Sequence, residues 1–233
     1  MGSNEKSQRS RPAPSASAVA LSSTIIVKVG AKQKKYTLHR KLLVYHSEYF
    51  RSALSGKFRE TDDGVIVLND IDTDAFDIFV DWIYETKLPT RIDTDAPGDG
   101  RTSVKYRAYV LAEKLLATDF KRILMDLIFT VIRNKHANPA SALIIYAFEN
   151  LPEKDAMLRL LVDAWCVHDS LNRMGDDDKA LLPQLPQVFL CGVIMKLNQL
   201  GKATVKNKKL WRKDYIGKEL EDREGYLKHE PVS

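Results

Sequence analysis

The stretch HRKLLVYHSEYF, residues 39–50, decides the fold that we expect for this chain. Side chains suited to one side of a helix recur through it and shortly beyond, with Leu43, Ser47, Phe50 and Leu54 at positions i, i+4, i+7 and i+11. Residues at these spacings lie on the same face of an α-helix. The stretch therefore predicts a single helix with one buried face.

Short strands are predicted on both sides of this helix. Two β-branched or aromatic runs at 24–29 and 35–38, joined by a polar turn, indicate a β-hairpin, and VIVL at 65–68 indicates a third strand. A second helix should start after Asp72, whose carboxylate can accept hydrogen bonds from the free N–H groups at a helix start. It should end near Pro89, because proline cannot continue a helix.

Only helical signals follow this point of the chain. Apolar periodicity predicts helices at 105–117, 119–133, 139–149, 153–168 and 186–200. The Asn138-Pro139 pair is expected to open the third of these helices. The last should carry Val193, Ile194 and Leu197 on its apolar face. A few short strands followed by helices alone predict an α+β fold with a helical extension, not an alternating parallel-sheet enzyme fold.

Large apolar residues at helical spacing are expected to form the core. Burying each of them would contribute roughly 1.5–3 kcal/mol. These core candidates are Leu43, Phe50, Phe76, Phe79, Ile83, Tyr109 and Leu124.

The quoted stretch resembles the H-x-x-x-L-x-x-x-S-x-x-F signature at the first helix of BTB/POZ domains, through His39, Leu43, Ser47 and Phe50. Three later segments resemble segments of the same family and follow in the family's order. They are FRE at 58–60 with VIVL at 65–68, the helix at 70–84, and YVLAEK at 109–114. Several linked segments are far more specific than any one of them. The sequence is most similar to the variant abundant in fungal proteins. The resemblance implies the BTB/POZ fold, a short three-stranded sheet flanked by a helical bundle.

This resemblance, together with composition, divides the chain into four parts. We expect a Ser/Pro/Ala-rich disordered leader at 1–22, the BTB/POZ domain at 22–133, an all-helical C-terminal extension at 134–200 and a charged tail at 201–233. Thr24 departs from the family pattern, in which many members have Asp before the first strand.

The sequence predicts no enzyme, no cofactor and no metal site. It contains no P-loop, no G-x-G-x-x-G, no G-x-S-x-G and no H-E-x-x-H pattern. Cys166 and His168 are two residues apart, so on a helix they point in different directions. His39 has no partner at metal-ligand spacing, and we expect it to fix a strand-to-helix corner. The aspartates at 176–178 are expected in a solvated turn. Cys166 and Cys191 should be buried thiols.

The resemblance implies self-association, since many BTB domains dimerise through the face built around their first helix. Here that face would include Leu42, Tyr45, Tyr49 and Ala53. Two tyrosines on one helix side favour an interface, because aromatic residues are enriched in interfaces. The alternative is that these side chains only cap the core or lie exposed.

The resemblance also implies a second partner, the cullin scaffold of ubiquitin ligases. Adaptors of that type carry a hydrophobic-x-Glu element shortly before the third strand, and Phe58 and Glu60 occupy the equivalent place. Phe58 could fill an apolar pocket while Glu60 makes a charge-assisted hydrogen bond. The alternative is that Phe58 closes the helix end against the core and Glu60 is solvated.

Two other functions stay open, a scaffold without a ligase link and a nuclear regulatory BTB protein. The basic cluster at 206–213 could serve nuclear import, although acidic residues follow at 219–224. Nucleic-acid binding is not favoured by the modest net charge of +5, and no membrane partner is expected. We therefore expect a protein of the cytoplasm, the nucleus or both, which assembles with itself and recruits an unidentified protein.

Overall fold

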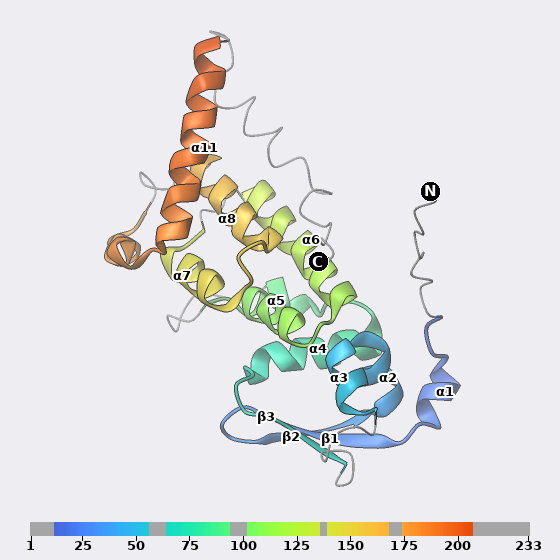
Figure 1. Ribbon diagram of the computed structural model, residues 1–233. Coiled ribbons are helices and arrows are strands. Elements are labelled where there is room, and N and C mark those ends of the chain that lie inside the picture. The colour runs from blue at the N-terminus through green and yellow to red at the C-terminus, as the bar shows by residue number, and fades with distance from the viewer. Residues whose placement is uncertain (1–11, 56–63, 94–101, 136–138, 168–173, 207–233) are drawn as a thin grey trace, which may run out of the picture. The chain divides into compact units, whose positions relative to one another are not determined.

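The structure is a computed structural model that describes residues 12–55, 64–93, 102–135, 139–167 and 174–206. It contains two compact units, one up to Asp70 and one from Ile71 onward, which are considered separately. Figure 1 shows the short strands in the first unit and helices throughout the second.

The first unit combines a three-stranded sheet with short helices. Its elements are α1 (Ala16–Ala20), β1 (Thr24–Val29), β2 (Lys34–His39), α2 (Arg40–His46), α3 (Glu48–Ala53) and β3 (Val65–Leu68). The strand order is β2-β1-β3, with β1 antiparallel to β2 and parallel to β3. In the central strand Val27 lies opposite Tyr36 on one side and Ile66 on the other. The sheet and its helices confirm the α+β expectation. Helix α1 lies where the sequence predicted only a disordered leader.

The prediction of a single helix carrying Leu43, Ser47, Phe50 and Leu54 is wrong. Two helices, α2 and α3, meet at Ser47, whose backbone is extended with φ −139° and ψ 124°. The Ser47 Oγ accepts a hydrogen bond from the Phe50 N–H at 3.1 Å, so this side chain caps α3. Ser47 is fully buried, as are Leu43 and Phe50 on either side of the break. The residues predicted to be buried are therefore buried, but the helix is interrupted at Ser47, which caps α3.

The second unit is all helical. Its elements are α4 (Thr73–Glu85), η2 (Thr90–Asp93), α5 (Val104–Lys114), α6 (Thr118–Lys135), α7 (Ser141–Asn150), α8 (Ala156–Val167), α10 (Asp176–Lys179), η3 (Leu182–Gln184) and α11 (Gln187–Lys206). The helical extension predicted from the sequence is thus present. Helix α11 continues six residues into the segment that we expected to be a charged tail.

Aromatic rings form the core between α4 and α6. The Phe120 ring lies 5.4 Å from Phe79 and 4.9 Å from Trp82, measured between ring centroids, within the usual range for aromatic pairs. All seven core candidates named from the sequence are buried, each with at most 1% of its surface exposed.

The start of α4 agrees with the sequence, whereas its end differs. The Asp72 Oδ1 accepts a hydrogen bond from the Ala75 N–H at 2.9 Å, which confirms the predicted cap. The helix stops at Glu85, before Pro89, because Thr86 turns left-handed with φ 56° and its N–H bonds back to the Trp82 carbonyl. Proline is therefore not what ends this helix.

Helix α7 begins differently from the prediction. Asn138 lies outside the described residues, and the helix starts at Ser141, so Pro139 is not its first residue. The Ser141 N–H donates to the Asp178 carboxylate at 2.6 Å, and this distant aspartate occupies the capping role. The turn expected at 176–178 is the short helix α10.

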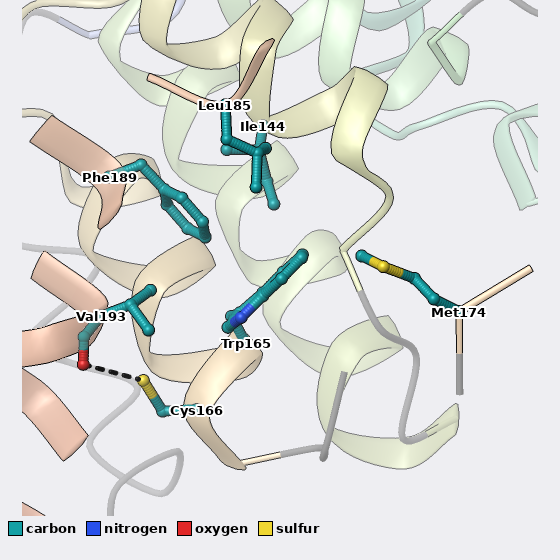
Figure 2. Close-up of a cluster of buried hydrophobic side chains, with 7 residues drawn as sticks. All are labelled: Ile144, Trp165, Cys166, Met174, Leu185, Phe189 and Val193. Carbon is teal, nitrogen blue, oxygen red and sulfur yellow. Dashed lines mark hydrogen bonds between the residues drawn. The ribbon is translucent and has the colours of Figure 1, made fainter. Parts of the chain in front are cut away.

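A second apolar cluster joins α7, α8 and α11 (Figure 2). Its members are Ile144, Trp165, Cys166, Met174, Leu185, Phe189 and Val193. Within the described ranges, no single helix has the length and apolarity to cross a membrane, although 176–184 and 187–199, bent by 105°, pass that test as a pair on length and composition.

The Ser47 cap generates a prediction about stability. Replacing Ser47 by Ala removes the acceptor for the Phe50 N–H, and we expect the free energy of unfolding to fall by about 1 kcal/mol. Urea unfolding followed by circular dichroism measures this change. Ser52 lies exposed on α3, so Ser52→Ala is the matched control and should not destabilise the chain. Equal stabilities for the two variants would contradict the capping role.

Candidate functional site

The first candidate site is the α2–α3 surface, which we define as Leu42, Tyr45, Tyr49 and Ala53. The structure divides this set into two pairs. Tyr45 and Tyr49 are partly exposed, while Leu42 and Ala53 are each only 7% exposed. The two tyrosines are therefore available for contact with another molecule, and the other two side chains mainly support the monomer.

Polar contacts hold α2 and α3 in a defined arrangement. The Arg51 Nε donates to the Val44 carbonyl at 3.1 Å, and the Arg51 guanidinium also pairs with Glu48. The Arg40 guanidinium donates to the Leu54 carbonyl at 2.6 Å. These two bonds tie the last turn of α3 and its C-terminal end to α2. The intervening tyrosines therefore project from a fixed scaffold.

Each tyrosine also has an aromatic neighbour. The Tyr45 ring stands edge-on to His46 with 4.7 Å between centroids, and the Tyr49 ring stands edge-on to the buried Phe50 at 5.3 Å. Edge-on ring contacts of this type are favourable, so they stabilise the observed side-chain positions. A preorganised aromatic pair loses less conformational freedom when it is buried in an interface.

The other residues singled out from the sequence fall in different places. His39 ends β2 and is the N-cap of α2, but its side chain makes no capping hydrogen bond. Phe58 and Glu60, the cullin-binding candidates, lie outside the described residues.

Sequence reasoning missed a buried ionic network in the second unit. The Lys121 ammonium lies 2.5 Å from a Glu113 oxygen and 2.5 Å from the Asp155 Oδ2. Lys121 and Asp155 are 6% and 8% exposed. The Tyr109 hydroxyl donates to the Asp155 Oδ1 at 3.0 Å, and the Lys121 ammonium lies 5.1 Å from the centre of the Tyr109 ring. These contacts connect α5, α6 and the start of α8.

The same aspartate organises the backbone and the local electrostatics. The Asp155 Oδ1 accepts a hydrogen bond from the Met157 N–H at 2.8 Å, in the first turn of α8. Burial, followed by the charge of Asp155, raises the pKa of Tyr109 far above its ordinary value, so its hydroxyl stays a proton donor. The sequence carried no signal for this network, because 34 residues separate Lys121 from Asp155.

The two cysteines have different environments, which corrects the expectation that both are buried. Cys166 is buried, with its thiol 3.8 Å from the Val193 carbonyl, whereas Cys191 is exposed, and the two do not form a disulfide. Burial, followed by the charge of Asp163, raises the pKa of Cys166 to about 11. A thiol with so high a pKa is a poor nucleophile. His168 lies outside the described residues.

Helix α11 also departs from its predicted pattern. Val193 is buried at 8% exposure, but Ile194 and Leu197 are 67% and 49% exposed. The three residues therefore do not share one buried face. Over the described part of the chain, no group of three or more His, Cys, Asp or Glu side chains is arranged to hold a metal ion.

Comparison with known proteins places the first candidate site within a recognised domain. Residues 20–116 match the BTB/POZ domain family. The chain is similar to Kelch repeat and BTB domain-containing protein 4 of Mus musculus, with 33% identity over 67 residues, which cover 29% of this chain and 12% of that protein. The proteins of the same name from Pongo abelii and Homo sapiens are 31% identical over 67 residues, which cover 13% and 12% of their lengths. The matched part thus spans about an eighth of the curated relatives.

The ionic network generates a second prediction about stability. Asp155→Ala would leave the Lys121 ammonium with one carboxylate and remove the cap of α8, and we expect a loss of about 3–5 kcal/mol in unfolding free energy. Asp155→Asn keeps the acceptor oxygen but not the charge, so its loss should be smaller. Denaturant unfolding measures both variants. Glu153 is exposed nearby, and Glu153→Ala is the control. If Asp155→Ala cost no more than this control, the network would not support the fold.

Proposed function

Because residues 20–116 of this chain form a BTB/POZ domain, which is a protein-interaction module, we propose that the chain self-associates and recruits a second protein. The family match carries this proposal, and BTB domains act through binding, not catalysis. The geometry of the α2–α3 surface supports it, because two partly exposed tyrosines stand on a hydrogen-bonded scaffold.

Self-association is assigned to the α2–α3 surface. Tyr45 and Tyr49 would supply the contact area, since aromatic side chains are enriched at the centres of interfaces and often dominate their energy. Leu42 and Ala53 are buried, so they would support the tyrosines from below. A two-fold dimer would bring the same surface of each copy together.

Recruitment is assigned first to a cullin scaffold, with this chain as a substrate adaptor of a cullin-type ubiquitin ligase. The support is the resemblance of the segment before β3, in which Phe58 and Glu60 form a hydrophobic-x-Glu element. The helical extension at 134–200 or the tail at 201–233 would then hold the recruited protein. The rival proposal is a scaffold with no ligase link, in the cytoplasm or the nucleus.

Self-association is tested by light scattering on a sizing column. The unmodified chain should have twice its 26.5 kDa mass. Tyr45→Glu with Tyr49→Glu should yield monomers, because burying two like-charged pairs across the dimer axis is unfavourable. Tyr84 is 44% exposed on α4, so Tyr84→Glu is the control and should leave the mass unchanged. A dimer that persists in the double variant would place the interface elsewhere.

The adaptor proposal is tested by mixing the chain with a cullin N-terminal domain. A heavier complex should form, and Phe58→Ala with Glu60→Ala should abolish it, because the apolar anchor and the charged hydrogen bond are both lost. Arg59→Ala lies between the two positions and is the matched control. Absence of any complex with the unmodified chain would favour the scaffold. Unchanged cullin affinity in the double variant would remove the motif from the proposal.

A further inference from the structure

Basic residues are concentrated in the first unit. From Pro12 to Ser47 the sequence contains no Asp or Glu. Its basic residues over the same range are Lys28, Lys32, Lys34, Lys35, Arg40 and Lys41, and the four lysines from Lys28 to Lys35 lie on the β1–β2 hairpin. Charges of one sign gathered on one hairpin create a positive potential that attracts anionic groups.

Two of these lysines are directly opposed in the sheet. Lys28 of β1 pairs with Lys35 of β2, so both side chains lie on one face, which we call the outer face of the sheet. Lys35 is exposed and Lys28 is partly exposed, whereas Val27 and Val29 on the other face are buried. Among the described residues, no carboxylate lies within ion-pair distance of Lys28, Lys32 or Lys35. Like charges directly opposite each other destabilise a sheet, so an anion bound over this pair would be favourable.

Strand β2 is also an open edge of the sheet. In the described part of the chain it pairs with β1 on one side and with no strand on the other. The Ile26 N–H donates to the Gly64 carbonyl at 3.0 Å on the β3 side, so Ile26 and its β2 partner Thr37 do not exchange hydrogen bonds. Backbone groups alternate in direction along a strand, so those of Thr37 and Lys35 face the open edge.

We propose that the open edge of β2 binds an acidic, extended segment of a recruited protein as an added strand. Strand addition supplies hydrogen-bond partners for the edge, and the added side chains alternate between the two faces of the sheet. Side chains on the outer face would lie beside Lys35 and should be Glu or Asp. Side chains on the other face would lie beside the half-buried Tyr36 and should be apolar.

The inference rests on the proposed function, in which the chain recruits a second protein, and it gives the docking segment of that protein its chemistry. Two other partners fit the edge less well. A second copy of β2 would bring lysine against lysine, and lysines on an edge strand oppose such pairing.

Single-stranded nucleic acid is the other partner that fits less well, because it binds largely by stacking its bases on aromatic side chains. The outer face carries no Phe, Tyr or Trp on its three strands. Its strand residues are Thr24, Ile26, Lys28, Lys35, Thr37, His39, Val65 and Val67. Tyr36 lies on the opposite face, because it pairs with the buried Val27. An acidic peptide therefore suits this surface better than a nucleic acid does.

Fluorescence anisotropy with a labelled peptide of alternating Glu and Val, long enough to span β2, tests the inference. The full-length chain should bind this peptide saturably. Lys28→Glu with Lys35→Glu should weaken binding at least about tenfold, because two attractions become repulsions. Lys87 and Lys114 are exposed in the second unit, so Lys87→Glu with Lys114→Glu is the control of equal net charge and should bind normally. A peptide of alternating Lys and Val should bind the Lys28→Glu, Lys35→Glu variant, which also shows that this variant is folded.

Backbone methylation of the peptide separates strand addition from charge attraction alone. One probe is N-methylated at every Glu nitrogen and a second at every Val nitrogen, so both keep their full charge. An added strand turns only one of these two sets toward β2, so one methylated probe should lose binding and the other should retain it. Equal binding of the two methylated probes would overturn strand addition.

Light scattering on the same samples separates this inference from the proposed function. A chain of dimeric mass that does not bind the Glu-Val peptide would overturn the inference and leave the proposed self-association standing. A monomeric chain that binds the peptide would support the inference and contradict self-association. Equal binding of a peptide with its Glu and Val residues in two separate blocks would overturn the alternating pattern. An oligothymidylate that binds more tightly than the peptide, and that requires Lys28 and Lys35, would assign the surface to nucleic acid instead.

Discussion

The second unit depends on one buried cation. Lys121 is 6% exposed, and its ammonium lies between Glu113 and Asp155, so these two carboxylates compensate a charge that is largely removed from water. A buried ion pair adds little net stability compared with apolar packing, but losing one partner is costly. The two carboxylates and the Lys121 ammonium connect α5, α6 and the start of α8.

This network joins the recognised domain to the helices that follow it. Tyr109 and Glu113 lie within the family match at residues 20–116, whereas Lys121 and Asp155 lie beyond it. The helical extension is therefore packed against the last helix of the match by polar contacts as well as apolar ones. Helix α11 packs in turn on α8, through the apolar cluster and the Lys196–Asp163 ion pair.

Two exposed surfaces of the chain differ in chemistry. Tyr45 and Tyr49 offer partly exposed rings with polar tips on a hydrogen-bonded helix pair. Helix α11 offers exposed aliphatic side chains without charge, such as Leu190, Ile194 and Leu197. Aromatic residues with polar groups are enriched in interfaces. The tyrosine pair is consistent with a protein-interaction module.

The sequence by itself determined the class of fold and the core. Leu43, Phe50 and Tyr109 are buried as their helical spacing predicted, since periodicity reports directly which side of an element avoids water. The resemblance to the BTB/POZ domain family could also be recognised from the sequence, because the residues of its signature are close together in the chain. Local chemistry predicted the Asp72 cap correctly.

Only the tertiary structure decided the features that depend on distant neighbours. Asp178 caps α7 although it lies 37 residues from Ser141 in the sequence. Asp155 pairs with Lys121, which lies 34 residues before it. Helix α11 is apolar on nearly every side, so its sequence could not say whether Val193 or Ile194 faces inward. Val193 faces inward because it packs with Trp165 and Cys166 in the folded chain, and the sequence alone does not show which surfaces meet.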